Sequence, residues 1–310
     1  MKGPFFTAGI DIGGTRIKMG IVELPAGHVV TSGTFDTEKV SESIFWTSIS
    51  TELDRQLLTA GLSGRALAGV GLSVGSYVYQ DGSIDGMASF VPFLIPGYSL
   101  QEKAEKNLRF PVYVDNDARL ISLAEAVYGS GRGFGRSLTI TLGSGVGVGL
   151  CVNGRPFGEE AFMHLAGHIK VRSGGEIPCL DAVPCYCGLS GCFESTCSGA
   201  SLEKYVKCQL GPEATNQEMF ALALGGNQIA LSCLDWYLKM LSAALNQYVY
   251  IYCPDVIVLG GGVSKGLVPW EDELNRRIVA EVHTGQHTVV RISSLLENSG
   301  ILGAASLFLN

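Results

Sequence analysis

Positive charge is scarce in this sequence. Its 22 lysines and arginines stand against 29 acidic residues, which gives a formal net charge of −7 over 310 residues. The sequence also has no lysine or arginine run and no basic amphipathic stretch. Such positive surfaces are needed for non-specific binding to nucleic acid or to anionic membranes. The composition therefore argues against a nucleic-acid partner and against a membrane partner.

Signals for export and membrane insertion are also missing. The N-terminal run MKGPFFTAGIDIGG has too short an apolar stretch for a signal peptide and no small-residue cleavage site. The most apolar long stretch, residues 228–253, carries Asp235 and Lys239 in its middle. This is typical of a buried helix rather than a membrane span. We expect a cytoplasmic protein.

The common nucleotide-binding motifs are absent as well, although the chain has 41 glycines. No segment matches the P-loop spacing G-x-x-x-x-G-K-[ST]. No G-x-G-x-x-G opens a plausible βαβ unit, because GSGVGVG is followed by the strand-like LCVNG. The ordinary nucleotide folds are therefore poor candidates.

What the chain does contain is an alternation of strand and helix patterns. With 46% hydrophobic residues it can bury a substantial core, and its length favours two domains. Residues 6–36 predict three antiparallel strands, residues 41–60 a helix, and ALAGVGLSV and FPVYVD buried strands. After Gly135 a strand, a glycine turn and a strand return. The pattern indicates an α/β protein with mixed sheets and two lobes of related design.

Glycine turns give the first chemical indication. In DIGGTR, Asp11 ends a strand, Gly13 and Gly14 would leave backbone N–H groups bare for an anion, and Thr15 and Arg16 add a hydroxyl and a cation. The alternative is an ordinary hairpin turn. The further turns LGSGVG and VIVLGGGVS favour phosphate binding, because three such turns are hard to explain by packing alone.

The nine cysteines, in a chain with no export signal, are expected to be thiols, metal ligands or catalytic groups. Cys185, Cys187 and Cys192 offer three soft ligands, and one more would complete a tetrahedron. The alternative is a set of buried thiols around a turn. We interpret the remaining cysteines as packing residues: Cys151, Cys179, Cys197, Cys208, Cys233 and Cys253. His283 and His287 have an i, i+4 spacing but no third partner, and we interpret them as surface or loop residues.

Six motifs in this order resemble the ROK family (repressors, open reading frames and kinases) of sugar kinases. They are DIGGTRIKMGIV, VYVDNDARLISLAEAVYGSGRG, LTITLGSGVGVG, CYCGLSGCFES, PDVIVLGGGVS and ENSGILGAASLF, and they cover essentially the whole chain. The resemblance implies a two-lobed, actin-like (ribonuclease-H-like) α/β fold with a cleft between the lobes. It assigns residues 1–117 and 299–310 to a smaller lobe, to which the final helix returns, and 118–298 to a larger lobe with a zinc loop.

The resemblance also implies roles for particular residues. ATP and Mg²⁺ would be held by the glycine turns and Asp11, a sugar or polyol would be the substrate, and a structural Zn²⁺ would be bound; a homodimer is suggested. Asp117 corresponds to the general base, although Asn and Asp in DNDA would also serve as a helix N-cap. The implied sets are, for the nucleotide, Asp11, Gly13, Gly14, Thr15, Gly143, Ser144, Gly145, Gly147, Gly260, Gly261 and Gly262; for the sugar, Asn116, His168 and Glu194; and for zinc, His168, Cys185, Cys187 and Cys192.

Departures from the family pattern lie mainly on the sugar side. Leu165 stands where the family usually has a sugar-binding glutamate, and Phe93 where it has an asparagine. We therefore expect an apolar patch in the sugar pocket, unless His164, Glu159 or Glu160 supplies the missing polar contact. The smaller departures are Gly75-Ser76 for Pro-Gly, Ser144 for threonine, Val148 for glycine and Arg16 for lysine.

Three functions are compatible with these motifs. The first is an ATP-dependent kinase acting on a hydroxyl of a hexose or a related sugar or polyol, and it is favoured because Asp11 and Asp117 are both present. The second is a sugar-responsive repressor, which would need a DNA-binding domain ahead of Asp11, where only ten residues stand. The third is a sugar-binding or regulatory protein without turnover, which the loss of a carboxylate at position 165 keeps open.

Overall fold

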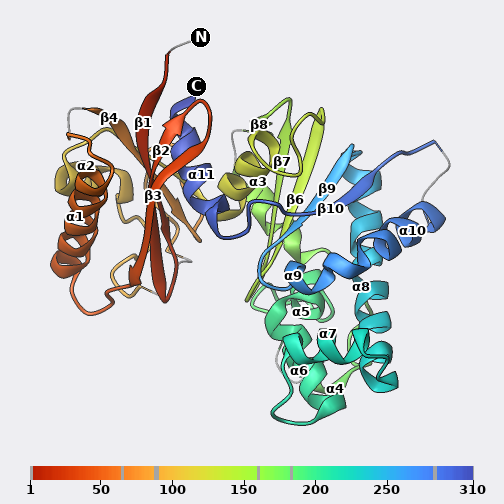
Figure 1. The fold of residues 1–310 in the computed structure, drawn as a ribbon. Helices are drawn as coiled ribbons and strands as arrows, with labels where there is room; N and C mark the ends of the chain where they lie inside the picture. The colour runs from red at the N-terminus through yellow and green to blue at the C-terminus, as the bar shows by residue number, and fades with distance from the viewer. Residues whose placement is uncertain are drawn as a thin grey trace. The chain divides into compact units, whose positions relative to one another are not determined.

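The computed structural model describes residues 3–63, 66–86, 91–158, 161–181, 184–281 and 285–309, with side chains of 161–164, 279–281 and 296 left aside. The chain forms two compact units, each with its own five-stranded sheet (Figure 1). Unit 1 comprises Met1–Ala124, Gly158–Phe162 and Glu297–Asn310, and unit 2 comprises Glu125–Phe157 and Met163–Leu296. The first division falls inside a continuous helix rather than at its first residue, Asp117.

Unit 1 is built on a mixed sheet with strand order β3-β2-β1-β4-β5. The first three strands are antiparallel, as predicted, and β4 and β5 run parallel to β1. Helix α1 begins after Ser41, whose hydroxyl accepts a hydrogen bond from the Ile44 N–H at 3.4 Å. The elements are β1 Phe5–Ile12, β2 Arg16–Leu24, β3 His28–Asp36, α1 Glu42–Thr59, β4 Leu67–Val74, α2 Leu100–Leu108, β5 Val112–Asn116, α3 Asp117–Val127, η4 Leu296–Asn298, α11 Ser299–Ala305 and η5 Ser306–Leu309.

The C-terminal helix α11 packs directly on the sheet of unit 1. A Cβ atom at Gly9 of β1 would lie 2.0 Å from the carbonyl oxygen of Ile301, and one at Gly71 of β4 would lie 1.8 Å from that of Ala304. Only glycine allows the helix backbone to approach the strands so closely. The last residues of the chain therefore complete the unit that the first residues begin.

Unit 2 is built on a second mixed sheet, with strand order β10-β9-β6-β7-β8. The predicted strand–glycine turn–strand after Gly135 is the antiparallel pair β6 and β7, while β9 and β10 run parallel to β6. The elements are β6 Arg136–Leu142, β7 Val146–Val152, β8 Arg155–Pro156, η2 Ala161–His168, α4 Pro178–Asp181, α5 Phe193–Cys197, α6 Gly199–Leu210, α7 Asn216–Leu224, α8 Gln228–Tyr252, β9 Val256–Gly260, α9 Ser264–Leu267, η3 Val268–Trp270, α10 Glu271–Glu281 and β10 Val289–Ile292.

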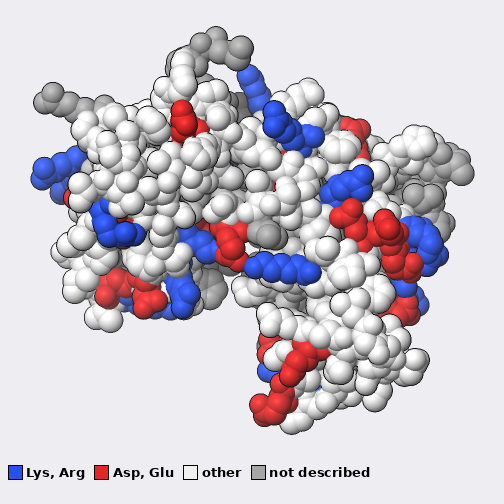
Figure 2. Space-filling model, in the orientation of Figure 1, with Lys and Arg blue, Asp and Glu red and all other residues white. Residues whose placement is uncertain are grey.

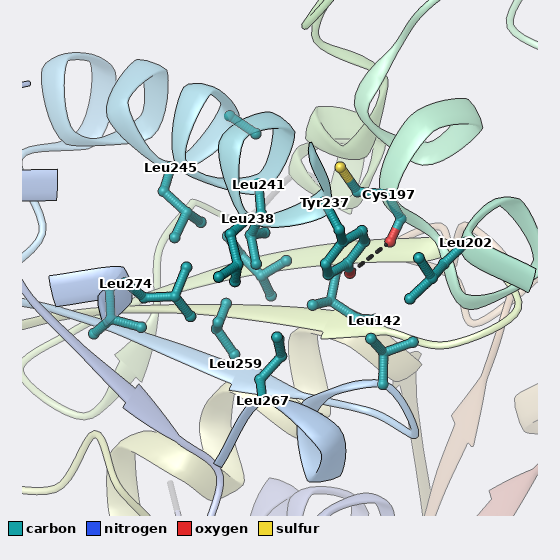
Figure 3. Close-up of a cluster of buried hydrophobic side chains, with 14 of the residues drawn as sticks. Leu142, Cys197, Leu202, Tyr237, Leu238, Leu241, Leu245, Leu259, Leu267 and Leu274 are labelled. Atoms are coloured by element: carbon teal, nitrogen blue, oxygen red, sulfur yellow. Dashed lines mark hydrogen bonds between the residues drawn. The ribbon is translucent and has the colours of Figure 1, made fainter. Parts of the chain in front are cut away.

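Helix α8 is the predicted buried helix and forms much of the core of unit 2. Leu238, Leu241 and Leu245 repeat at helical spacing and are buried on one side, where they face the sheet (Figure 3). The buried Tyr237 hydroxyl donates a hydrogen bond to the carbonyl oxygen of Cys197 at 3.0 Å, which satisfies its polar atom inside the core. Within the described residues, no helix is both long and apolar enough to cross a membrane.

The described surface carries charges of both signs. On the face drawn in Figure 2, lysine and arginine side chains are interspersed with aspartate and glutamate, without a continuous basic patch among the described residues of that face. Ion pairs among the described residues at the surface include Lys207 with Glu203 and Arg276 with Glu273. Exposed pairs of this kind contribute little to stability.

Candidate functional site

Asp11 is the second-last residue of β1 in unit 1 and lies beside Ser73, its register partner on the parallel strand β4. The Ser73 hydroxyl donates a hydrogen bond to Asp11 Oδ1 at 2.7 Å. Burial raises the pKa of Asp11, although this hydrogen bond and the charge of Lys18 lower it. Gly300 of α11 makes room for the carboxylate, because a Cβ there would lie 2.6 Å from Asp11 Oδ2. No local sequence signal pointed to Ser73, because only the strand register brings it to Asp11.

The turn after Asp11 is partly closed by its own hydrogen bonds. The prediction of a free N–H at Gly13 was wrong. This N–H donates to the carbonyl oxygen of Arg16 at 3.1 Å and closes the hairpin. Thr37 holds the turn from outside: its hydroxyl donates to Gly13 O at 2.7 Å and its N–H to Thr15 O at 2.9 Å. In the described part of the chain, the N–H groups of Gly14 and Thr15 have no acceptor. The turn is thus both a hairpin and a place where two N–H groups can meet an anion.

Asn116 ends β5 and caps helix α3. Its buried side-chain oxygen accepts from the N–H groups of Ala118 at 3.0 Å and Arg119 at 3.3 Å, so the N-cap interpretation of DNDA is confirmed for this residue. Its side-chain nitrogen donates to the carbonyl oxygen of Ser76 at 3.1 Å. The Asn116 side chain also forms a hydrogen bond to the Asp117 carboxylate, which lowers the pKa of Asp117 and holds this carboxylate beside the amide.

Asp117 is the first residue of α3, and its carboxylate has the electrostatics of a base. Burial and the charge of Asp11 raise the pKa of Asp117 to about 6, against the lowering effect of the Ala118 N–H, which donates to Oδ1 at 2.7 Å. A Cβ at Gly75, in the loop after β4, would meet Asp117 Oδ2 at an ordinary contact distance of 3.6 Å. A carboxylate with a pKa of about 6 is ionised near neutral pH and still accepts protons well.

Arg119 was not singled out from the sequence. Its Nε atom lies 3.1 Å from both carboxylate oxygens of Asp115, and its Nη1 donates to the carbonyl oxygen of Gly158 at 3.2 Å. The ion pair is largely buried, with side-chain exposures of 11% and 17%. The spacing of four residues between Asp115 and Arg119, at a strand-to-helix junction, could have indicated this ion pair from the sequence. This pair fixes the strand end from which Asn116 and Asp117 extend.

Four predicted ligands come together in unit 2. The donor atoms of His168, Cys185, Cys187 and Cys192 all lie within 4.8 Å of one another. His168 Nδ1 faces the sulfurs, at 3.7 Å from Cys185 Sγ and 3.8 Å from Cys192 Sγ. With metal–sulfur bonds of about 2.3 Å and metal–nitrogen bonds of about 2.0 Å, tetrahedral ligand atoms stand roughly 3.5–3.8 Å apart. The arrangement fits a Cys3His zinc site.

The backbone explains why these residues meet. Lys170 forms a β-bridge with Cys192, and the N–H of Phe193 donates to the carbonyl oxygen of Ile169 at 2.8 Å, which brings the end of η2 beside the last cysteine. Gly188 and Gly191 adopt φ values of 80° and 73°, so the cysteine loop turns tightly. The N–H and the hydroxyl of Ser195 both lie 3.3 Å from Cys192 Sγ and would stabilise a thiolate there.

The other cysteines do not join this cluster. Cys151, Cys197 and Cys233 are buried, as expected of packing residues, whereas Cys208 and Cys253 are exposed and that interpretation was wrong for them. Cys208 lies in α6 beside Cys179, and Cys253 follows the last turn of α8 with φ of 47°. His287 is exposed in a loop, as predicted, and His283 lies outside the described residues.

Glu194 connects the cysteine loop to the glycine turn of unit 2. Its Oε2 accepts a hydrogen bond from the N–H of Val146 at 3.0 Å, and a Cβ at Gly145 would lie 2.7 Å from the same oxygen. Gly143 closes the turn through its N–H to Gly145 O at 3.0 Å. Ser144 lies at the tip of this turn, and Gly147 lies inside β7 opposite Thr141. Glu194, predicted to bind the sugar, is therefore also a support of the turn.

The third glycine turn follows β9. Gly260 is the last residue of the strand, and Gly261 has φ of 84° with a Cβ position only 2.5 Å from the carbonyl oxygen of Leu142. Gly262 has open space at its Cβ position, before α9 begins at Ser264. The sequence Gly260-Gly261-Gly262 therefore gives a turn that passes close to the end of β6, which an L side chain at Gly261 would prevent.

The two residues that depart most from the family pattern differ in their surroundings. Phe93 is partly buried and packs its ring edge-on against Phe45 at 5.3 Å, against the core of unit 1, so an apolar neighbour accounts for its bulk. Leu165 in η2 has an exposed side chain, three residues before His168. Glu159 and Glu160 lie outside the described residues, as does the side chain of His164.

Comparison with known proteins agrees with this geometry. The ROK family model matches residues 7–310. A glucokinase from Halalkalibacterium halodurans is 30% identical over 96% of this chain and 93% of its own length, and the N-acetylgalactosamine kinase AgaK from Shewanella sp. is 30% identical over 83% and 82%. The crystal structure of a ROK family glucokinase from Streptomyces griseus in complex with glucose and AMPPNP is 25% identical, covers 97% of this chain and 98% of its own, and has a TM-score of 0.73.

This chain belongs to the ROK family. The predicted family, the actin-like α/β fold class and the class of enzyme, a sugar kinase, are confirmed.

Proposed function

We propose that the protein transfers the γ-phosphoryl group of ATP to a hydroxyl group of a hexose or an N-acetylhexosamine, with Asp117 as the general base. The observation that carries this proposal is the carboxylate of Asp117, whose pKa is raised to about 6 by burial and by Asp11. Phosphoryl transfer needs little covalent chemistry from the protein beyond positioning, charge neutralisation and a proton acceptor. Asp117 has the ionisation expected of that acceptor.

In this reaction the substrate hydroxyl gives its proton to Asp117 and its oxygen forms a bond to the γ-phosphorus of ATP. The bond from that phosphorus to the bridging oxygen breaks, and ADP leaves with the electron pair. Asn116 would contact a sugar hydroxyl, as the resemblance implies, while its bonds to Ser76, Ala118 and Asp117 hold it at the start of α3. Because Asn116 caps the helix that begins with Asp117, substrate binding and proton transfer would share one rigid support.

The nucleotide would be held by the glycine turns. In unit 1, the N–H groups of Gly14 and Thr15 offer two donors to a phosphate. Asp11 offers a carboxylate oxygen for Mg²⁺, a hard cation that takes oxygen ligands. In unit 2 we assign Gly143, Ser144, Gly145 and Gly147 to phosphate, and Gly260, Gly261 and Gly262 to the adenosine end. The AMPPNP complex of the Streptomyces griseus glucokinase supports ATP as the phosphoryl donor.

We assign the Cys3His cluster to a structural zinc ion. The donor set fits, since three thiols and one imidazole nitrogen lie within 4.8 Å and no carboxylate or open position is needed. When bound, the ion would supply folding energy and a fixed loop rather than redox chemistry. His168 and Glu194, which the resemblance assigns to the sugar, would then be held by the same loop. The cytoplasmic location and the homodimer stay predictions.

The decisive test is ADP release from ATP and Mg²⁺ with a panel of acceptors: glucose, N-acetylglucosamine, N-acetylgalactosamine, N-acetylmannosamine and myo-inositol. We expect sugar-dependent ADP formation with at least one hexose or N-acetylhexosamine. The second candidate is a sugar-binding protein without turnover, favoured by Leu165 in place of a carboxylate. Sugar binding by calorimetry without ADP release from any of these acceptors would establish it and exclude the kinase.

A further inference from the structure

Tyr186 lies in the sequence between two of the proposed zinc ligands, and it contacts His168 although it is exposed. Its side chain is 64% exposed. Even so, its hydroxyl oxygen lies 2.7 Å from His168 Nε2, and the two rings meet edge to face at 4.8 Å with an angle of 83°. A hydroxyl and a ring contact together fix the phenol against one imidazole.

The orientation of His168 determines which atom donates in this hydrogen bond. Nδ1 faces the sulfurs of Cys185 and Cys192 at 3.7 and 3.8 Å, so Nδ1 is the nitrogen aimed at the ligand cluster. A ligating nitrogen carries no hydrogen, and the imidazole proton is then on Nε2. Nε2 therefore donates to the Tyr186 oxygen, and the phenolic hydrogen points elsewhere. Among the described residues, this hydroxyl has no second hydrogen-bond partner.

We propose that Tyr186 is a specificity-determining residue, which holds His168 by its hydroxyl oxygen and presents its own O–H to the sugar in place of the imidazole N–H. The inference rests on the proposed function, in which the sugar binds beside His168. The consequence is chemical as well as spatial. The phenol extends the contact outward by one side chain, and it donates to a hydroxyl, a ring oxygen or an N-acyl carbonyl of the sugar.

A substrate with an acceptor farther from the imidazole would therefore be favoured. An N-acylated hexose has such an acceptor in its amide carbonyl, whereas unsubstituted glucose has only its hydroxyl oxygens. The exposure of Tyr186 agrees with this role, because a group that serves only to orient a metal ligand does not need to be solvent-accessible. Tyr186 thus offers the sugar a polar contact near His168, whereas Leu165 lacks the carboxylate that the family pattern has at that position.

The test compares Tyr186→Phe with the native protein. The phenylalanine keeps the edge-to-face ring contact and removes the hydroxyl, and Tyr250→Phe, at a comparably exposed position on α8, is the matched control. Three quantities are measured: zinc per chain by elemental analysis, Kd by calorimetry without ATP for glucose, N-acetylglucosamine and N-acetylgalactosamine, and kcat and KM for each sugar that is phosphorylated.

We expect Tyr186→Phe to retain its zinc and its kcat within about threefold, while Kd and KM for the preferred sugar rise about tenfold, the effect of one lost hydrogen bond. Tyr250→Phe should match the native protein. Unchanged Kd values for all three sugars in Tyr186→Phe would overturn the inference, and so would loss of zinc with the affinity, which would make Tyr186 a support of the metal loop. If the native protein binds none of these sugars and releases no ADP with any acceptor of the panel, the proposed function fails as well, whereas native binding with an unaffected Tyr186→Phe removes only this inference.

Discussion

The glycine turns of the two units have the same local design but different supports. Each joins two antiparallel strands, β1 to β2 and β6 to β7, and each is closed by the N–H of its first glycine, Gly13 at 3.1 Å and Gly143 at 3.0 Å. The turn of unit 1 is held from outside by Thr37. The turn of unit 2 is held by Glu194, which lies two residues after Cys192 of the Cys3His cluster.

The difference separates two kinds of dependence. In unit 1 the turn follows Asp11, whose charge raises the pKa of Asp117, so in the proposed reaction phosphate binding and proton transfer would be coupled by electrostatics. In unit 2 the turn is connected by Glu194 to the cysteine loop, which we propose to bind zinc. It is also packed against Gly167 of η2, where a Cβ would lie 2.3 Å from Val146 O. We therefore expect changes in unit 1 to act on chemistry, and changes in the metal loop to act on structure and on binding.

The largest effect should come from Cys187→Ser, which removes one donor of the Cys3His cluster and so loosens the loop that carries Glu194. Removing one of four ligands should abolish stoichiometric zinc, and because the binding energy of a structural zinc ion is also folding energy, solubility and thermal stability should fall with it. Elemental analysis and thermal unfolding measure both. Cys253→Ser, an exposed cysteine outside the cluster, is the control. Native protein purified without chelator that lacks zinc would contradict the assignment.

The next largest effect should come from Asp117→Asn, which tests the chemical half of the comparison. The change keeps the shape of the side chain but removes the proton acceptor, so kcat should fall about 10²- to 10⁴-fold while ATP binding is nearly unchanged. The exposed Asp54→Asn on α1 is the control. A loss of less than about tenfold would mean that another group is the base.

The pH dependence should report the same carboxylate. Only ionised Asp117 accepts a proton, and its pKa is raised to about 6, so kcat/KM should be level above that pH and fall about tenfold per unit below it. Neutralising Asp11 by Asp11→Asn removes one cause of the raised pKa and should move the inflection to lower pH. An inflection near pH 4 in the native protein would contradict the electrostatic coupling.

A paired substitution compares the two turn supports directly. Thr37→Val removes the hydroxyl bound to Gly13 O, and Glu194→Ala removes the acceptor of the Val146 N–H. We expect Thr37→Val to raise KM for ATP about five- to tenfold and leave the sugar KM unchanged, as expected for one lost hydrogen bond. Glu194→Ala should raise KM for both substrates. Equal effects of the two variants on the sugar would show that Glu194 is only a turn support.

Much of this arrangement could be predicted from the sequence, because the signals were local. The three antiparallel strands, the helix after Ser41 and the buried α8 follow from apolar periodicity, and the Cys3His cluster from cysteine spacing together with the family resemblance. The supports could not be predicted in this way. Ser73 reaches Asp11 only through strand register, and Thr37 and Glu194 reach their turns across 24 and 48 residues of chain.

The same limit explains the incorrect predictions. Gly13 was expected to present a bare N–H, but the closure of the hairpin occupies it, and this depends on the turn geometry rather than on residue type. Phe93 replaces a polar residue of the family pattern, and Phe45 provides an apolar partner for its ring, while its place in a sugar pocket stays a prediction. A substitution relative to a family motif shows that a contact is lost, but only the surrounding side chains show what replaces it.

The smallest effect is expected from Leu165→Glu. This substitution tests whether sugar selection in unit 2 depends on a carboxylate at position 165. The Leu165 side chain is 39% exposed in η2, without the core packing that explains Phe93, so a glutamate can be introduced at little cost to folding. A carboxylate there would accept hydrogen bonds from sugar hydroxyls, and a site built to bind a hydroxyl discriminates against ligands that leave its polar groups unpaired. Leu165→Glu should therefore raise kcat/KM for glucose relative to N-acetylglucosamine about three- to tenfold, as expected for one added hydrogen bond. Leu222→Glu on α7, at 42% exposure, is the matched control and should leave the ratio unchanged. If the native protein already uses glucose as well as any analogue, and Leu165→Glu does not shift the ratio, then Leu165 has no part in sugar selection and the polar contact is supplied elsewhere in the site.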